Sequence, residues 1–508
     1  MAKRPEATDY EIGILGTGSM GRGIAQIMAS AGVSVLLLDQ NAAAAEDARA
    51  FALKMIYRAV EKGTITAEHA NLADERLIVA SDVDQFSACD AVIEAAHEDI
   101  SIKKNIFVTL ESIVSEDCIL ATNTSSLSIT DIGSVLKYPG RFAGFHFFNP
   151  VPLMKIVEVI SGLETAPSTS KTLSSLAQRA GHEFVLAKDS PGFLINHAGR
   201  GLNTEGLRIV GEGIANFSEI DDLIREGGPG FPMGPFELMD TTGLDVSQPV
   251  MESIYDQFYQ EPRFRPDPLT QVRLAAGLFG RKTGRGFYTY ESGRKIAINE
   301  NPPSEDFPRS VWIQGSDDVG KNSLVDALAP HVQIDHGDRP SSQSVCLFAP
   351  LGQDVTTSAV GAGVEAERSF AVDTLFGMGG RRTLMTSPVS DTSLCVQVHA
   401  LLAADGNPVT VIKDSPGFVV QRTIAMVVNI GCEIAQRGIA SPLDIDKAVR
   451  LGLGYPMGPL QLGDELGARK ILKILDELLN FYGDPRYRPS PWLKRRVMLG
   501  VSLLTQED

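Results

Sequence analysis

The sequence lacks the cysteine pattern that a disulfide framework or a zinc site would need. Its five cysteines are scattered along 508 residues, odd in number, and never form a C-x-x-C pair. Such cysteines are typical of small buried hydrophobic residues in a reducing compartment, so we expect a cytoplasmic protein. The histidines also form no H-x-x-x-H or comparable spacing, and we therefore expect no bound metal.

Long apolar runs and positive charge are also scarce. No stretch approaches the ~18 apolar residues of a membrane span, and the charged first residues predict no secretory signal. There are 46 Lys and Arg against 63 Asp and Glu, which gives a net charge of −17. A surface this acidic repels phosphate backbones and anionic lipids, so we expect neither nucleic acid nor a membrane as partner. One local basic pocket for a phosphorylated cofactor remains compatible with this charge.

Hydrophobic residues, at 43 % of the chain, are frequent enough to form several cores. Alternating strand-like and helix-like segments over residues 9–187 predict an α/β Rossmann-like domain with a parallel, doubly wound sheet. Residues 188–290 are helix-like and predict an all-α domain. The polar residues 291–309 have the composition of a linker.

The second half of the chain repeats landmarks of the first. The repeated motifs are Lys-Asp-Ser-Pro-Gly-Phe, at 188–193 and 413–418, and Pro-Met-Gly-Pro, at 232–235 and 456–459. Because the two offsets agree to within one residue, we predict that residues 406–508 are a second copy of the all-α domain. Residues 310–405 between the copies contain short strand-like runs and predict a degenerate α/β domain.

A glycine turn in the first domain has the dinucleotide-binding pattern. Residues 16–21 form G-x-G-x-x-G between an expected strand and an expected helix. Such glycines permit a tight turn and close approach of a pyrophosphate, and the helix N-terminus supplies partial positive charge. Asp39 ends the next strand-like run, where a carboxylate can accept hydrogen bonds from ribose hydroxyls and would repel a 2′-phosphate. We therefore predict NAD, rather than NADP, as the cofactor.

A second glycine pattern, residues 315–322, has the spacing of a P-loop. Asn322 replaces the Ser or Thr that would bind magnesium, and Asp317 and Asp318 place negative charge where phosphate would lie. We interpret this segment as a turn that begins a helix.

Two residues could form a base and its partner for alcohol oxidation. His146 lies at the end of an expected strand among aromatic residues, and Glu158 lies in an apolar strand-like run. A His–Glu pair would hold the imidazole in one tautomer and stabilise the imidazolium that forms on proton uptake. The residues alone are equally compatible with two core side chains that are merely hydrogen-bonded.

Several motifs together resemble the L-3-hydroxyacyl-CoA dehydrogenase family. They are the glycine turn, Asn-Thr-Ser-Ser at 123–126, His-Phe-Phe-Asn-Pro at 146–150, Lys-Ile-Val-Glu at 155–158, Asp-Ser-Pro-Gly-Phe at 189–193 and Lys-Thr-Gly-Arg-Gly-Phe-Tyr at 282–288. They occur in family order and spacing over residues 9–290, and the duplicated tail extends the resemblance to the whole chain. This long form is similar to the family members of phenylacetate breakdown that act on 3-hydroxyadipyl-CoA, and to related 3-hydroxybutyryl-CoA enzymes.

The resemblance implies NAD-dependent oxidation of an L-3-hydroxyacyl-CoA to the 3-ketoacyl-CoA. By motif position it makes His146 the base and Glu158 its partner, with Ser125 and Asn196 holding the substrate oxygen. The residues that it and the glycine turn assign to the cofactor are Gly16, Gly18, Ser19, Met20, Gly21, Asp39, Glu98, Lys103 and Asn123. His197 departs from the family, where Arg is usual. Of two interpretations, an altered acyl pocket and a surface histidine, we expect the second.

The second copy does not repeat this site. Gln421 occupies the position of Asn196, and no counterpart of His146 is recognisable around Asp373, so we expect one active site per chain. The resemblance also implies that the all-α domain at 188–290 serves substrate binding and dimerisation, because single-copy family members form dimers through their helical domains. We therefore expect the second helical copy to cover the first, within one chain or between two chains of a homo-oligomer.

Two other functions stay open at this point. One is a dehydrogenase of the same build that acts on sugar acids or nucleotide sugars, although such enzymes rely on a lysine or cysteine in a different motif. The other is an NAD-binding structural or regulatory protein that has lost catalysis. Retention of Ser125, His146, Glu158 and Asn196 argues against that loss.

Overall fold

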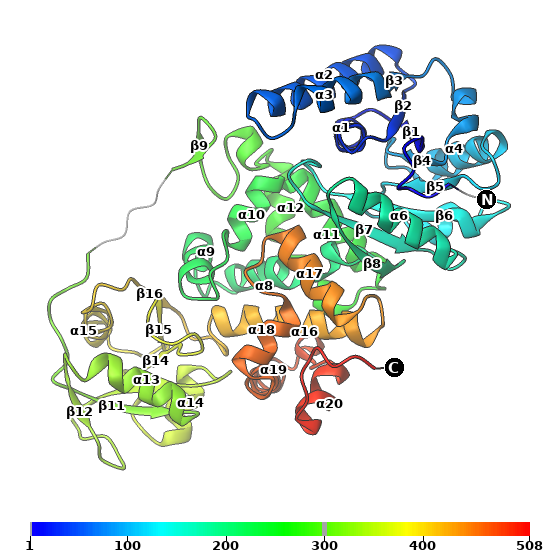
Figure 1. The fold of residues 1–508 in the computed structure, drawn as a ribbon. Helices are drawn as coiled ribbons and strands as arrows, with labels where there is room; N and C mark the ends of the chain where they lie inside the picture. The colour runs from blue at the N-terminus through cyan, green and yellow to red at the C-terminus, as the bar shows by residue number, and fades with distance from the viewer. Residues whose placement is uncertain (1–2, 297–301, 508) are drawn as a thin grey trace. The chain divides into compact units, whose positions relative to one another are not determined.

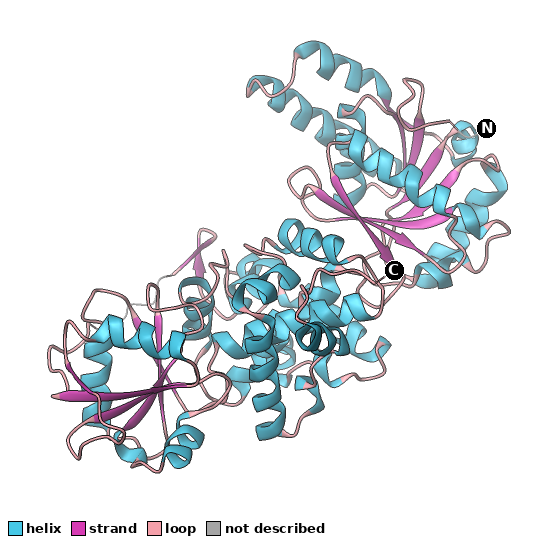
Figure 2. Ribbon diagram, turned by 60° about the horizontal axis from the view of Figure 1, so that its bottom comes forward, coloured by secondary structure: helices cyan, strands magenta, loops and turns pink. Residues whose placement is uncertain are grey.

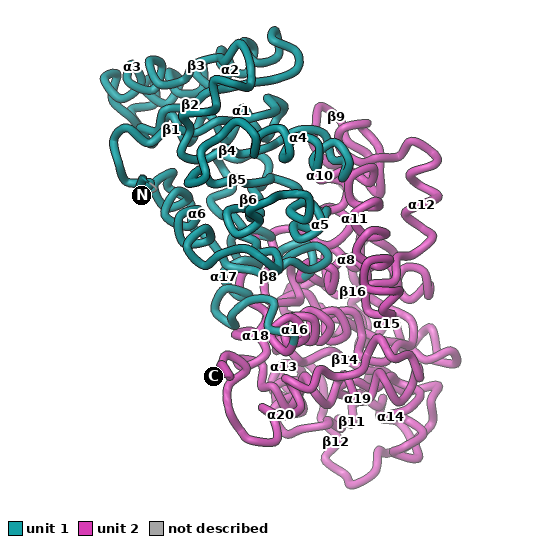
Figure 3. Tube along the Cα trace, turned by 90° about the vertical axis from the view of Figure 1, so that its right-hand side faces the viewer, with its two compact units in different colours: residues 1–197, 437–453 teal, residues 198–436, 454–508 magenta. Residues whose placement is uncertain are grey.

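The computed structural model of the protein describes residues 3–296 and 302–507 (Figure 1). The chain forms two compact units, which are described one at a time (Figure 3). Unit 1 comprises Met1–His197 and Arg437–Leu453, and unit 2 comprises Ala198–Gln436 and Gly454–Asp508. Among the residues so described, no helix is long and apolar enough to cross a membrane.

Unit 1 contains an eight-stranded sheet in the order β3-β2-β1-β4-β5-β6-β7-β8. Its strands are β1 (Glu11–Leu15), β2 (Ser34–Leu38), β3 (Leu77–Val79), β4 (Ala91–Glu94), β5 (Ile119–Thr122), β6 (Phe142–Phe147), β7 (Ile156–Ser161) and β8 (Glu183–Lys188). The first six run parallel, and β7 is antiparallel to β6. The order 3-2-1-4-5-6 is that of a doubly wound dinucleotide-binding sheet. The predicted Rossmann-like domain is therefore confirmed.

Helices cover both faces of this sheet (Figure 2). The helices of this part of the chain are α1 (Ser19–Ser30), α2 (Ala42–Glu61), α3 (Ala67–Arg76), α4 (Ile100–Ile113), α5 (Ile129–Gly133), α6 (Pro167–Arg179) and α17 (Pro442–Leu453), with the short α7 (Ile195–Ala198) at the boundary with unit 2. Because both faces are covered, the central strands β4, β5 and β6 are buried at every residue. That explains their continuous rather than alternating apolar character.

Helix α17 belongs to unit 1, although it lies in the region expected to form the second helical domain. The Lys188 N–H donates to the Ile439 carbonyl at 2.8 Å, and α17 contacts β8. The compact units therefore follow spatial contact rather than the expected order of segments along the chain.

Unit 2 is mainly helical and contains a second, six-stranded sheet. Its helices are α8 (Arg200–Gly211), α9 (Phe217–Glu226), α10 (Pro235–Thr242), α11 (Leu244–Gln257), α12 (Pro268–Ala275), α13 (Asp318–Leu328), α14 (Val355–Ala362), α15 (Thr392–Leu402), α16 (Val420–Gln436), α18 (Pro459–Leu466), α19 (Ala468–Tyr482) and α20 (Pro491–Leu499). The sheet has the order β12-β11-β13-β14-β15-β16. Its strands are β11 (Ser310–Gly315), β12 (Gln333–Asp335), β13 (Val345–Ala349), β14 (Ser369–Val372), β15 (Arg382–Thr386) and β16 (Val409–Ile412).

The segment expected to be a linker begins as a hairpin. Strands β9 (Tyr290–Glu291) and β10 (Arg294–Lys295) pair in antiparallel fashion. Residues 297–301 of the expected linker lie outside the described residues.

The P-loop-like spacing forms a turn and a helix start, as predicted. Asp317 is the N-cap of α13, and its Oδ1 accepts a hydrogen bond from the Gly320 N–H at 2.7 Å. The negative charge of this capping carboxylate would repel a phosphate bound at the same place.

Helices α8 and α16 pack closely within unit 2. A Cβ added to Gly201 would lie 2.9 Å from the Val427 Cα, so the two backbones touch at this glycine. Arg422 of α16 forms an ion pair with Glu205 of α8, and both side chains are fully buried. Burial by itself would raise the pKa of Glu205, but the charges of Arg486 and Arg422 and the hydrogen bonds from Tyr487 and Arg422 lower it to about 2.

Candidate active site

The glycine turn between β1 and α1 has room for a ligand on one side only. Gly16 adopts φ +96°, and a Cβ there would lie 2.6 Å from the Ala95 backbone. A Cβ at Gly21 would collide with the Gly16 carbonyl. A Cβ at Gly18, in contrast, would meet nothing within 4 Å. Two glycines therefore allow tight packing inside the protein, while Gly18 leaves its backbone open to a phosphate. Ser19 and Met20 begin the helix at this opening.

Asp39, at the end of β2, is tied to the glycine turn. Its Oδ2 accepts hydrogen bonds from the Thr17 N–H at 2.8 Å and the Thr17 hydroxyl at 2.9 Å. Its Oδ1 accepts from the Asn41 N–H at 3.0 Å. Burial raises the pKa of Asp39, but the hydrogen bonds from Asn41 and Thr17 outweigh it, and the pKa is lowered overall. The carboxylate is thus ionised at neutral pH. Thr17 was not singled out from the sequence, although its place inside the motif was visible.

His146 and Glu158 lie opposite each other on the antiparallel strands β6 and β7. The His146 Nδ1 is 2.6 Å from the Glu158 Oε2, and both side chains are buried. The other carboxylate oxygen, Oε1, accepts the N–H groups of Leu194 and Ile195 at 3.0 and 2.8 Å. Because a carboxylate accepts hydrogen bonds, this contact fits the tautomer with the ring proton on Nδ1, which leaves the lone pair of Nε2 free. The sequence did not reveal the two backbone donors.

Aromatic rings surround the His146 ring. The ring centroids of Phe148 and Phe193 lie 4.4 and 5.9 Å from that of His146. Such apolar neighbours exclude water from the imidazole and strengthen its interaction with the carboxylate.

Glu98 organises the loop after β5 that contains Ser125. Its Oε1 accepts the Thr124 hydroxyl at 2.6 Å and the Ser125 N–H at 2.9 Å. Burial raises the pKa of Glu98, but the Thr124 hydroxyl and the Lys103 charge lower it overall. Glu98 therefore acts as an anion that holds this loop.

Lys103 is buried and already paired. Its Nζ lies 2.6 Å from the Glu94 Oε1 and 3.4 Å from the Glu98 Oε2. Glu94, at the end of β4, also accepts the Thr122 hydroxyl at 2.7 Å. Glu94 was missed in the sequence, and the signal that could have found it is a carboxylate ending the buried run of residues 91–94.

Asn123 and Asn196 are both near the His146–Glu158 pair: Asn123 bonds to the residue after His146, and Asn196 follows a residue that bonds to Glu158. The Asn123 Oδ1 accepts the Phe147 N–H at 2.9 Å, which ties the end of β5 to the end of β6. Asn196 is half-buried in α7, directly after Ile195, whose N–H binds Glu158. The C-terminal ends of parallel strands share one sheet edge, so the turn, Asp39, Glu98 and the β6 end all belong to that edge.

His197 is fully buried, so the expectation of a surface histidine is wrong. Ile195, in the same helix α7, packs against α17: a Cβ on Gly452 of α17 would lie 2.6 Å from the Ile195 Cδ1. This contact comes from a segment about half the chain away in sequence and could not be inferred locally.

In the second half, Gln421 is engaged in purely internal contacts. Its amide donates to the Pro350 carbonyl and to the Asp373 Oδ1, both at 3.0 Å, and accepts the Gly352 N–H at 2.8 Å. Burial raises the pKa of Asp373. Among the residues described in this segment, no histidine–carboxylate pair comparable to His146–Glu158 occurs.

Comparisons with known proteins place these features in context. The model of the 3-hydroxyacyl-CoA dehydrogenase NAD binding domain matches residues 11–190. The model of the C-terminal domain of the same enzymes matches residues 192–290 and residues 417–503.

Individual relatives agree with the family models. The chain is 36% identical to 3-hydroxyadipyl-CoA dehydrogenase of Escherichia coli K12 over 96% of this chain and 97% of the relative. It is 37% identical to the mitochondrial hydroxyacyl-coenzyme A dehydrogenase of Sus scrofa over 55% of this chain and 90% of the relative. A crystal structure of 3-hydroxybutyryl-CoA dehydrogenase from Escherichia coli K12 has a TM-score of 0.84 and 34% identity, covering 97% of this chain and 98% of that one.

Proposed function

The chain belongs to the 3-hydroxyacyl-CoA dehydrogenase family and is an NAD-dependent enzyme that oxidises 3-hydroxyacyl-CoA, and we propose that His146 is its base. The observation that carries this role is the 2.6 Å contact between His146 Nδ1 and Glu158 Oε2. The relatives support neither a sugar-acid dehydrogenase nor an inactive NAD-binding protein.

In the proposed mechanism, His146 Nε2 accepts the proton of the substrate 3-hydroxyl. Glu158 stabilises the imidazolium, and its second oxygen is held by the Leu194 and Ile195 amides, so the pair is pre-positioned. Bound NAD supplies the acceptor for the hydride that leaves C3. Ser125 and Asn196 orient the substrate oxygen.

The glycine turn and Asp39 fit a bound NAD. The open backbone at Gly18 suits the pyrophosphate, and the ionised Asp39 suits the adenosine ribose hydroxyls. We also propose that Glu98, Lys103 and Asn123 border the nicotinamide end. Lys103 acts there through Glu94 and Glu98 rather than as an exposed cation.

Asp39 should make the enzyme prefer NAD over NADP, because its negative charge repels a 2′-phosphate. Replacing Asp39 with Ser and Gln40 with Arg should shift the ratio of the two kcat/KM values toward NADP by ~10-fold or more, the range of one charge-assisted hydrogen bond. Asp47→Ser, an exposed change on α2, is the matched control. A wild-type enzyme that uses NADP as well as NAD would refute the role of Asp39.

Two narrower proposals concern the acyl group of the substrate and the pathway in which the enzyme acts. The similarity over nearly the whole chain to a relative named 3-hydroxyadipyl-CoA dehydrogenase supports 3-hydroxyadipyl-CoA as the substrate. The resemblance to the long family members then favours phenylacetate catabolism as the pathway, with β-oxidation of shorter acyl-CoAs as the related alternative. Comparing kcat/KM for 3-hydroxyadipyl-CoA and 3-hydroxybutyryl-CoA tests this. Equal or better use of the shorter substrate would favour the alternative.

We further propose that residues 406–508 are a second copy of the all-α domain at 188–290, and that 310–405 are a degenerate α/β domain. Helices α10 and α18 both begin at a proline after glycine and are followed by glycines at φ +91° and +93°, Gly243 and Gly467. The same domain model matches both regions, which supports duplication. In unit 2 the copies contact each other through α8 and α16 of one chain.

Residues 1–295 expressed alone should aggregate or dimerise. Without α16, the face of α8 around Gly201 and Leu202 would be bare, and Glu205 would lose its buried partner Arg422. Light scattering after size-exclusion chromatography measures the outcome, with the full chain as control. A monodisperse, fully active monomer would show that the second helical copy covers nothing essential.

A further inference from the structure

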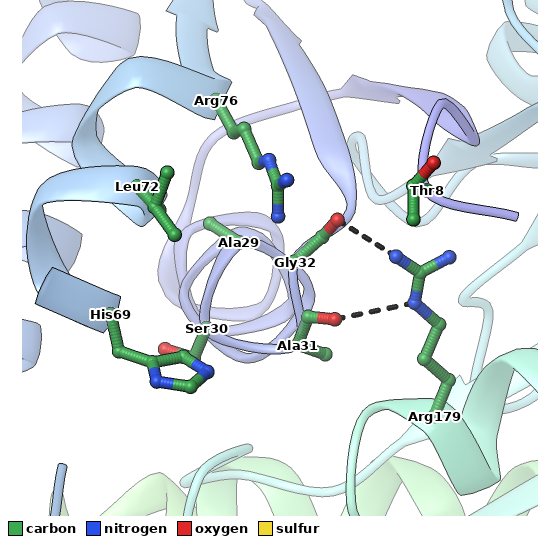
Figure 4. A pocket seen from close by; sticks show the side chains of 9 residues that line it. All are labelled: Thr8, Ala29, Ser30, Ala31, Gly32, His69, Leu72, Arg76 and Arg179. Carbon is green, nitrogen blue, oxygen red and sulfur yellow. Dashed lines mark hydrogen bonds between the residues drawn. The ribbon is translucent and has the colours of Figure 1, made fainter. Parts of the chain in front are cut away.

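A cavity of about 290 Å³ lies in unit 1 at the C-terminal end of α1, the end away from the glycine turn (Figure 4). Residues 29–32 form one wall, and Thr8 of the N-terminal segment contributes a hydroxyl. Helix α3 contributes His69 and Arg76, and α6 contributes Arg179. Two arginines, a histidine and a threonine from separate segments thus line a space that could hold several waters, at about 30 Å³ each.

The two guanidiniums approach the same backbone point from two sides (Figure 4). A Cβ built on Gly32 would lie 2.6 Å from the Arg76 Nη1 and 3.8 Å from the Arg179 Nη2. Arg179 is held in place by carbonyls: its Nε donates to Ala31 at 3.2 Å and its Nη2 to Gly32 at 2.7 Å. Its remaining nitrogen binds the carbonyls of residues 5 and 7 of the N-terminal segment. Arg179 is therefore a fixed positive charge in the wall.

Arg76 differs from Arg179 because its donors are unused. Among the described residues, its guanidinium has no hydrogen-bond acceptor and no ion-pair partner, and Arg179 has no ion-pair partner either. Burial and the nearby charge of Arg76 both lower the pKa of Arg179, and the smaller effects of Glu6 and Tyr10 oppose them. In a chain with a net charge of −17, two adjacent arginines without an ion-pair partner among the described residues are a local exception.

We propose that this cavity binds a small phosphate-type anion, which Arg76 contacts directly beside the fixed charge of Arg179 and the Thr8 hydroxyl. Guanidinium groups match the geometry of phosphate oxygens, and two neighbouring cations favour a dianion over a monoanion. The size of the cavity suits a single phosphate group, and the acidic surface opposes a polyanion such as nucleic acid. The ligand is free phosphate or a small phosphomonoester. The site is distinct from the glycine turn, since the two occupy opposite ends of α1.

Isothermal titration of the full chain with inorganic phosphate, at constant ionic strength and with saturating NADH to fill the glycine turn, tests the proposal. Arg76→Gln should weaken phosphate binding ~10-fold or more, the range of a lost charge-assisted hydrogen bond, and leave NADH binding unchanged. Arg76→Lys should retain part of the affinity, because it keeps the charge but loses the planar fork. Arg58→Gln, an exposed change on α2, is the control and should bind as the wild type does.

A parallel titration with glycerol 3-phosphate distinguishes the two sources. Tighter binding than inorganic phosphate would identify a phosphomonoester ligand, and weaker binding would identify free phosphate. Absence of phosphate binding to the wild type, or equal affinities of the Arg76→Gln and Arg58→Gln variants, would overturn the proposal.

Discussion

Replacing His146 with Gln should lower kcat by at least ~100-fold, the low end of general acid–base contributions. The glutamine side chain can fill the space but cannot take up a proton from the substrate hydroxyl at neutral pH. NADH binding should be almost unchanged, because no contact links His146 to the glycine turn or to Asp39 among the described residues.

Steady-state kinetics with acetoacetyl-CoA and NADH measure the effect, and a fluorescence titration of NADH checks the cofactor site. His331→Gln, an exposed histidine of unit 2, is the matched control and should retain wild-type turnover. Near-wild-type kcat in a folded His146→Gln protein would remove His146 from the mechanism.

The Glu158→Gln variant is a second test of the His146–Glu158 pair. The amide oxygen would stay with the Leu194 and Ile195 N–H groups, which leaves the NH₂ facing His146 Nδ1. A donor at that place forces the ring proton onto Nε2, the atom that must accept the substrate proton. The wrong tautomer in a comparable triad lowers kcat by ~10⁴, so we expect a loss of ~10² to ~10⁴. An active Glu158→Gln enzyme would limit Glu158 to a packing role.

Replacing Arg422 with Leu should destabilise unit 2 by ~3–5 kcal/mol, the range for breaking a buried ion pair. The change leaves Glu205 fully buried beside a hydrocarbon, and Glu212 also loses two hydrogen bonds from the guanidinium. Arg486 is close enough to compensate in part, at 3.1 Å from the Glu205 Oε2.

Denaturant unfolding followed by tryptophan fluorescence measures this loss, since Trp492 is buried in α20, which packs on α16. Arg469→Leu, an exposed change on α19, is the control and should stay within ~0.5 kcal/mol of the wild type. A similarly small effect of Arg422→Leu would mean that hydrophobic packing alone holds α8 against α16.

The Glu205–Arg422 ion pair also predicts that the stability of the folded protein depends on pH. The pKa of Glu205 is lowered from 4.5 to about 2, so the folded protein gains stability from the ionised carboxylate above pH 4.5. That contribution should disappear progressively as the pH falls from 4.5 toward 2. Thermal unfolding across this range should show a shallower acid slope for Glu205→Gln than for the wild type.

The sequence by itself determined the features that depend on neighbouring residues. The glycine turn followed by a helix, the carboxylate at the end of β2 and the continuous apolar strands are all local patterns, and each lies where it was predicted. His146 and Glu158 were visible as candidates, because two polar residues in apolar strands need partners.

Only the tertiary structure decided which partners those are. The Glu158 carboxylate accepts hydrogen bonds from the backbone amides of residues 194 and 195, and His197 is buried. Glu205 pairs with Arg422, more than 200 residues away. The guanidiniums of Arg76 and Arg179 likewise lie near each other only because helices α3 and α6 both end close to Gly32. These contacts depend on how helices and strands pack over long sequence separations, and neither residue type nor periodicity carries that information.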